Sequence, residues 1–208
     1  MGSVGTTPQV EWAEAHHVSP GHTESGDLHV VLPHRRGTLL GVIDGCGHGP
    51  HAARAAHRAA EVLREEPDGS VLAQLQRCHE ALAGSRGVVL TLADFDAGER
   101  TVTLCGIGNV EAMLFRARPI RGAPARETAL LRGGIVGGDM PPPHASVVPV
   151  HAGDVLVLLT DGVRPDFGAE LALRQPPQRL ADQLLARHSK GNDDALVLVA
   201  RFPACADE

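Results

Sequence analysis

The sequence predicts a mixed α+β fold in which antiparallel strands dominate. Several short runs alternate apolar and polar residues and are joined by tight turns that contain Gly or Asp. Three longer segments, residues 51–65, 71–82 and 177–188, carry apolar residues at helical spacing instead. The chain of 208 residues shows no solenoid repeat and no low-complexity linker, so we expect one domain that spans residues 1–208.

The composition indicates an aliphatic core and argues against several partners. Hydrophobic residues make up 43% of the chain but aromatic ones only 2%, so Leu, Val, Ile and Ala must fill the interior. A net charge of −6 argues against binding to nucleic acid or to an anionic membrane surface. Without a signal peptide or a membrane-length apolar run, we expect a soluble protein of the cytoplasm. The cysteines form no Cys-x-x-Cys pair that would indicate a zinc or disulfide site, and stand at Cys46, Cys78, Cys105 and Cys205.

The elements follow from periodicity and from the residues that end each run. The predicted strands cover residues 10–18, 28–32, 38–44, 87–95, 101–105, 110–115, 130–131, 146–150, 154–159 and 196–201. The first helix should bury Ala52, Ala55, Ala56, Ala59 and Leu63. The second, with Ser70 as its N-cap, should bury Val71, Leu72, Leu75, Cys78 and Leu82, and the third Leu180, Leu184 and Leu185.

Two aspartates fall at the ends of neighbouring strands. Asp27 begins one strand and Asp44 ends the next, with a short turn between the two strands at residues 34–37. In an antiparallel pair, the start of one strand lies beside the end of the next. We therefore expect both carboxylates on the same edge of the sheet.

The segment around Asp44 has a pattern suited to binding a cation. An apolar run ends in Asp44, and glycines 45, 47 and 49 then lead into the first helix. Gly45 has no Cβ, so its carbonyl can turn toward whatever Asp44 holds. A carboxylate with a backbone oxygen suits Mg²⁺ or Mn²⁺, although Asp-Gly after a strand is also an ordinary turn. A phosphate loop is excluded because no Gly-Lys-Ser/Thr follows.

Two glycine-rich segments depart from regular secondary structure. Residues 106–109, Gly-Ile-Gly-Asn, should interrupt a strand and allow a close backbone approach. Residues 133–143 are rich in Gly and Pro and can form neither a helix nor an ordinary strand. This loop is either a crossover connection or a flap that faces the substrate, and we favour the flap, because long irregular loops are often functional.

The C-terminal half repeats the strand-end aspartate. An apolar strand ends in Thr160-Asp161-Gly162, and Asp193 and Asp194 stand just before the last strand. Acidic residues at four strand ends, Asp27, Asp44, Asp161 and Asp193, are a more specific pattern than any one Asp-Gly pair.

These motifs resemble those of the metal-dependent protein phosphatases of type 2C, in the bacterial branch typified by SpoIIE. The resemblance runs from about Ser25 to Phe202 and rests on Ser25-Gly26-Asp27, Asp44-Gly45-Cys46-Gly47-His48-Gly49, Gly106-Ile107-Gly108-Asn109, Thr160-Asp161-Gly162 and Asn192-Asp193-Asp194. Within that branch the chain looks most like a stand-alone phosphatase of the stressosome, a bacterial stress-signalling complex. The resemblance implies a four-layer α-β-β-α sandwich, with two packed antiparallel sheets flanked by helices.

The resemblance also implies a mechanism. Two Mn²⁺ or Mg²⁺ ions would lie where the sheets meet, held by Asp27, Asp44, Gly45, Asp161, Asp193 and Asp194. Asp44 would bridge both ions, and Asp194 is better suited to support or cap the strand than to bind directly. A water with a lowered pKa would attack phosphoserine or phosphothreonine. The implied partners are phosphorylated STAS-domain scaffold proteins of a stressosome-like complex.

The chain departs from the family pattern at two positions. Some relatives hold the substrate phosphate with an N-terminal arginine, but no Lys or Arg precedes Arg35 here, so metal, water and backbone must hold it. Cys46 stands where those relatives place a histidine proposed as a general acid. His48 is the alternative candidate for that acid, and His51 is interpreted as a solvated surface residue.

Two other functions are compatible with parts of this pattern. Cys46 and the missing arginine would suit a non-catalytic binding module that keeps the phosphatase fold. A two-metal phosphodiesterase or nuclease is disfavoured, because the chain is acidic and has no basic stripe.

Overall fold

The computed structural model describes residues 2–7, 9–167 and 171–203, so Cys205 lies outside the described residues. The first sheet contains β1 (Val4–Thr7), β2 (Val10–His17), β7 (Glu111–Phe115), β8 (Arg126–Thr128), β11 (Val155–Leu159) and β12 (Ala195–Arg201). The second contains β3 (Asp27–Pro33), β4 (Gly37–Gly45), β5 (Val88–Asp96), β6 (Thr101–Ile107), β9 (Leu131–Arg132) and β10 (Ser146–Pro149). The helices are α1 (Pro50–Glu65), α2 (Val71–Ala81) and α3 (Pro177–His188).

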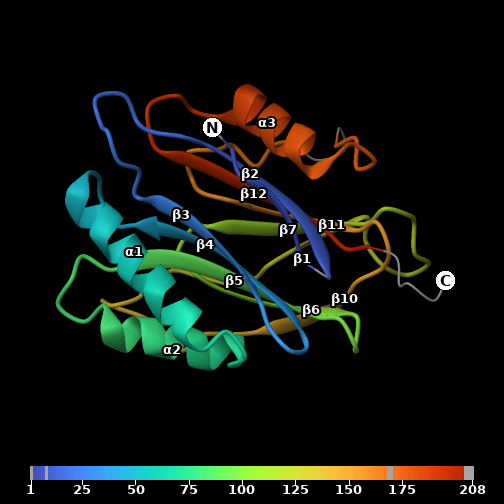
Figure 1. Cartoon of the computed structure of the whole chain (residues 1–208), viewed down its shortest axis with the longest axis horizontal. Helices are drawn as coiled ribbons and strands as arrows, with labels where there is room; N and C mark the ends of the chain where they lie inside the picture. Colours follow the sequence, from blue (N-terminus) through green and yellow to red (C-terminus); the bar gives the residue numbers. More distant parts are fainter. Residues whose placement is uncertain (1, 8, 168–170, 204–208) are drawn as a thin grey trace.

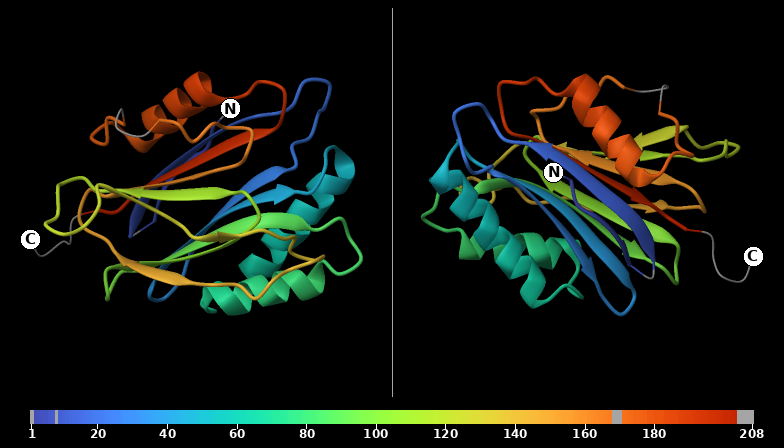
Figure 2. Two further views of the ribbon diagram at one scale, coloured as in Figure 1. Left: turned by 180° about the vertical axis from the view of Figure 1, so that it is seen from behind. Right: turned by 45° about the horizontal axis from the view of Figure 1, so that its top comes forward.

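The elements stack in four layers, as the family resemblance implied. Figure 1 shows α3 over the first sheet and α1 with α2 over the second, and both views in Figure 2 keep this order. The first sheet runs β1-β2-β12-β11-β7-β8 and the second β10-β6-β5-β4-β3. All pairs are antiparallel except the short β9, which lies parallel to β6. No helix among the described residues is long and apolar enough to cross a membrane.

Strand periodicity divides the interior into three apolar layers. In β4, Leu40 and Val42 pack between the two sheets, whereas Leu39 and Ile43 pack against α1 and α2. A third layer fills the space between the first sheet and α3. Alternate side chains of a strand face opposite sides, and the central strands are buried on both faces, namely β4, β5, β7, β11 and β12. This explains why they appear in the sequence as nearly continuous apolar runs.

The helices confirm most of the predicted core positions. The five predicted residues of α1 are all buried, and the Ser70 hydroxyl accepts a hydrogen bond from the backbone N–H of Ala73 as an N-cap. The prediction that Leu72 is buried was wrong, because this residue is 40% exposed. Gln74 takes the inward position instead, where its amide donates to the backbone carbonyl of Glu66.

Some strand predictions were incomplete. The edge strands β1 and β8 were missed, because each is short and polar. Gly106 and Ile107 continue β6 rather than interrupting it, and the strand breaks only at Gly108. The close approach was expected: a Cβ on Gly106 would lie 2.4 Å from the hydroxyl oxygen of Thr91.

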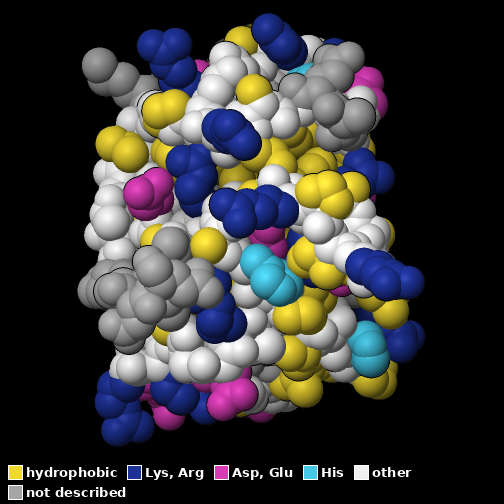
Figure 3. Space-filling model, turned by 90° about the vertical axis from the view of Figure 1, so that its right-hand side faces the viewer, with side chains coloured by type: hydrophobic (Ala, Val, Ile, Leu, Met, Phe, Trp, Pro, Cys, Tyr) yellow, Lys and Arg dark blue, Asp and Glu magenta, His cyan; other side chains and the backbone are white. Residues whose placement is uncertain are grey.

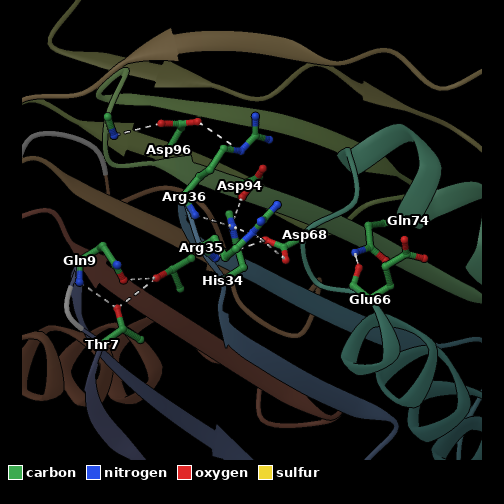
Figure 4. A network of polar contacts seen from close by, with 12 residues as sticks. Thr7, Gln9, His34, Arg35, Arg36, Glu66, Asp68, Gln74, Asp94 and Asp96 are labelled. Atoms are coloured by element: carbon green, nitrogen blue, oxygen red, sulfur yellow. Dashed lines mark hydrogen bonds and ion pairs between the residues drawn. The ribbon is translucent and has the colours of Figure 1, made fainter.

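Buried polar groups tie the layers together at the end of the strands away from Asp44. His34, in the β3–β4 turn, contacts Asp94 of β5 at 2.8 Å and Asp68 of the α1–α2 turn at 3.4 Å (Figure 4). The Arg116 guanidinium, at the end of β7, donates to the Pro149 carbonyl of the other sheet at 2.7 Å and to the Asp154 carboxylate at 2.9 Å. These contacts join both sheets and the helical layer.

Candidate active site

The register of the second sheet sets Asp27 and Asp44 side by side. The two residues are direct partners in the antiparallel β3–β4 ladder, as predicted. Leu40 and Val42 of β4 face the other sheet, so Asp44, two residues further on, continues that face. The carboxylates therefore lie where the apolar layer between the sheets opens to solvent.

The first sheet brings its aspartates to the same end. β11 and β12 are antiparallel partners, so the residues after Leu159 lie beside those before Ala195. The hydroxyl of Thr160 donates to Oδ2 of Asp27 at 2.7 Å and accepts from the backbone N–H of Leu196 at 2.9 Å. This buried hydroxyl fixes the Asp27 side chain from the opposite sheet.

The predicted acidic residues line one open cavity of about 390 Å³. Its walls are formed by Asp27, Asp44, Cys46, Gly47, His48, Val89, Asn109, Asp161, Asp193 and Asp194. Among the described parts of the chain, no three His, Cys, Asp or Glu side chains stand close enough to cage one ion by themselves. The carboxylates surround the space instead, so a cation there would also need water or backbone oxygens, as Mg²⁺ usually does.

Burial and the shared charge of the cavity raise the pKa of two carboxyl groups. Burial, then the charge of Asp44, raises the pKa of Asp27 to about 8. Burial, then the charges of Asp161, Asp193 and Asp194, raises the pKa of Asp44 to about 7. Repulsion between like charges in one cavity is relieved by protons or by a bound cation. The cavity is therefore electrostatically suited to a hard divalent cation.

Two of the wall residues are held by specific hydrogen bonds. Both oxygens of Asp194 accept backbone N–H groups, from Ser19 at 2.7 Å and from Gly26 at 2.7 Å. Asp194 therefore connects the loop before β3 to the start of β12, which agrees with its predicted supporting role. The amide of Asn109 donates to Oδ2 of Asp161 at 2.8 Å, which orients that carboxylate.

The glycine loop lets α1 approach the site closely. A Cβ on Gly45 would lie 2.2 Å from the carbonyl oxygen of Ala52, so packing alone requires glycine there. Gly47 has a φ of 94°, a left-handed conformation that favours glycine. The loop turns within a few residues, and α1 begins with Pro50 in its first turn. Gly45 itself is not among the residues that line the cavity, and the role of its carbonyl as a ligand stays a prediction.

Known proteins share this sequence pattern and this fold. A family model described as Stage II sporulation protein E (SpoIIE) matches residues 34–203. This chain belongs to the SpoIIE family. The phosphoserine phosphatase RsbX of Bacillus subtilis (strain 168) is 21% identical over 185 residues, which cover 88% of this chain and 89% of RsbX.

Solved structures of other proteins have the same fold as this chain. The crystal structure of RsbX in complex with magnesium matches with a TM-score of 0.85 and 19% identity, over 97% of this chain and all of that one (100%). A chain solved in work on the bacterial stressosome as a modular system matches with a TM-score of 0.82 and 27% identity, over 92% of this chain and 99% of that one. The SpoIIE-family chain thus has the fold of the type 2C phosphatases.

Two candidate proton donors of this SpoIIE-family chain differ in their surroundings. Burial and then the charge of Asp44 raise the pKa of the Cys46 thiol, which keeps it neutral. His48 is exposed at the rim of the cavity, where its ring lies 5.2 Å from that of His22. His51 does not line the cavity, and its ring contacts Arg54 at 2.7 Å on the solvated face of α1, as expected.

Other functional candidates were missed because their roles depend on distant partners. Asn109 and Thr160 were noticed only as members of motifs, and their hydrogen bonds to Asp161 and Asp27 span 52 and 133 residues of sequence. Residues 133–143 do not line the cavity. Val136 in this loop is buried and forms a bridge with Val88, so the structure supports the crossover interpretation and not the flap.

Proposed function

We propose that this protein is a Mn²⁺- or Mg²⁺-dependent phosphatase that hydrolyses phosphoserine and phosphothreonine in partner proteins. The observation that carries this proposal is the meeting of Asp27, Asp44, Asp161 and Asp193 around one open cavity between the sheets. The SpoIIE family and the likeness to the phosphoserine phosphatase RsbX support it. The partners that fit best are phosphorylated STAS-domain scaffold proteins of a stressosome-like complex, because one matched chain comes from stressosome work.

The acidic residues would hold two cations. Asp44 stands among the other carboxylates and would be a ligand, with the Gly45 carbonyl beside it. Asp27, Asp161 and Asp193 would supply further carboxylate ligands, and Asp194 would keep the loop in place. When bound, such cations supply a water of lowered pKa as nucleophile and offset charge on the phosphoryl oxygens.

The chain itself then orients the groups that surround the reaction. Thr160 and Asn109 fix two of the carboxylates by hydrogen bonds, so these need little rearrangement to act as ligands. His48 lies at the rim, where it can donate a proton to the serine or threonine oxygen that leaves. Cys46 is a weaker candidate, because burial and then the charge of Asp44 raise the pKa of its thiol and make it a weaker acid.

A metal titration combined with a turnover assay tests the proposal. We expect Mn²⁺ to bind in calorimetry and a phosphoserine peptide to be hydrolysed only when the metal is present. Asp44→Asn should abolish both, whereas Asp182→Asn, at an exposed position on α3, should change neither. Equal rates for wild type and Asp44→Asn would refute the phosphatase. Tight metal binding without turnover would favour the non-catalytic binding module.

A further inference from the structure

An arginine that the sequence did not single out stands beside the cavity. A Cβ placed on Gly47 would lie 2.9 Å from Nη1 of Arg86, and Gly47 lines the cavity. Arg86 belongs to the connection between α2 and β5, which Figure 1 shows at the same end of the molecule as the start of α1. A positive charge therefore lies against the rim of a strongly acidic cavity.

The backbone on both sides of Arg86 is fixed by hydrogen bonds. The N–H of Cys46, in the cavity wall, donates to the carbonyl of Gly87 at 3.1 Å. The N–H of Gly87 donates to the Ser85 hydroxyl at 3.0 Å, and that hydroxyl donates to the Leu82 carbonyl at 2.7 Å. The backbone of Arg86 is therefore held in a fixed position next to the glycine loop, residues 45–49.

The guanidinium has no partner within the part of the chain that the structure describes, and its side chain is exposed. Other arginines of the helical layer differ: Arg77 pairs with Glu65 and Glu66 at 3.1 Å each, and Arg54 contacts His51. Arg86 pairs with none of the cavity's carboxylates, although it lies beside their loop. Its donors are therefore available to an anion that comes from outside.

We propose that Arg86 binds the phosphoryl group of the substrate at the mouth of the cavity. A guanidinium offers paired N–H donors that match two phosphate oxygens, and it would offset the repulsion between the phosphate and the carboxylates. The sequence suggested that metal, water and backbone alone hold the phosphate, since no basic residue precedes Arg35. Arg86, in the connection between α2 and β5, supplies the positive charge that the segment before Arg35 lacks. This inference rests on the proposed phosphatase function.

Phosphate binding measured by calorimetry tests the role of Arg86 apart from turnover. Inorganic phosphate is titrated into Mg²⁺-loaded wild type, Arg86→Ala, Arg86→Lys and Arg118→Ala. Arg118 is also exposed, but it lies in the loop between β7 and β8 at the opposite end of the molecule. Figure 3 shows that end, where basic side chains are scattered among apolar and uncharged ones.

We expect Arg86→Ala to weaken phosphate binding about tenfold, the order of one lost charge-assisted contact. Arg86→Lys should be intermediate, because it keeps the charge without the paired donors, and Arg118→Ala should match wild type. With a phosphoserine peptide, KM of Arg86→Ala should rise about tenfold while kcat stays within about twofold, as expected when ground-state binding is lost.

Two outcomes separate this proposal from the general function. If wild type is active and Arg86→Ala matches it in phosphate affinity and in KM, the role of Arg86 is overturned while the phosphatase stands. If wild type neither binds Mg²⁺ nor hydrolyses the peptide, the phosphatase fails. Phosphate titration of the metal-free protein then tests whether Arg86 binds phosphate, independently of the phosphatase activity. Equal phosphate affinities for wild type and Arg86→Ala would refute that role.

Discussion

Asp27 and Asp44 are direct partners across the β3–β4 ladder, and Thr160 holds Asp27 from the other sheet by a 2.7 Å hydrogen bond. The two acids therefore cannot move apart without disturbing either the ladder or the contact between the sheets. Their repulsion is built into the fold, and it should be measurable as pH-dependent stability.

Without metal, the protein should lose stability as pH rises from about 4 to about 8. The folded protein holds the pKa of Asp27 at about 8 and that of Asp44 at about 7, above their ordinary value of 3.8. The folded state therefore binds more protons than the unfolded chain, so the free energy of unfolding falls across this range. Urea unfolding in EDTA at pH 5 and pH 8 measures it.

Added Mg²⁺ should restore more stability at pH 8 than at pH 5, because the cation replaces protons as the source of positive charge. Asp27→Asn and Asp44→Asn should each flatten the dependence on pH in the metal-free protein. A metal-free wild type that is equally stable at both pH values would contradict the expectation.

Substitutions at Asp193 and Asp194 should separate metal binding from support of the loop. Asp194→Ala removes the acceptor of two backbone N–H groups and should cost about 2–3 kcal/mol in the free energy of unfolding. Asp193→Asn, at an exposed position, should leave stability within about 0.5 kcal/mol and weaken Mn²⁺ binding. Denaturant unfolding in EDTA and calorimetry with Mn²⁺ measure the two effects. Equal losses of stability would show that both residues support the loop.

His48→Ala should slow the enzyme according to its leaving group. Serine is a poor leaving group that needs a proton, so kcat for a phosphoserine peptide should fall about a hundredfold. An aryl phosphate with an acidic phenol leaves without that proton, and its kcat should change less than about threefold. His51→Ala is the matched control, since His51 lies on the solvated face of α1. A uniform loss with both substrates would assign His48 a structural role.

Arg116→Met should destabilise the fold by about 3–5 kcal/mol, because it leaves a buried carboxylate without its counter-charge. Asp154, which is 1% exposed, would keep the backbone N–H groups of Ala117 and His151 and the His151 ring at 3.7 Å, which carries a charge only when protonated. Because this contact lies at the end of the strands away from the cavity, kcat and KM of the folded variant should be unchanged. Asp154→Asn in the same background should recover part of the loss in urea unfolding.

Local pattern predicted the features that depend on neighbours in sequence. The Asp27–Asp44 pairing followed from the strand-turn-strand pattern, and the inward face of α1 followed from alanines at helical spacing. Residues whose placement depends on partners far along the chain were not predictable in this way. Asn109, Thr160 and Arg86 acquire their roles only when separate elements meet, and β1 has too few residues to show a clear period.

The place of β12 in the first sheet has a consequence for protein synthesis. This strand is made after all the others, yet it lies between β2 and β11, and the Asp194 that precedes it orders the loop before β3. While the ribosome is still adding residues 195–201, β2 and β11 have no partner between them, and the acidic cavity lacks one wall. The protein should therefore gain activity only once these residues have left the ribosomal exit tunnel.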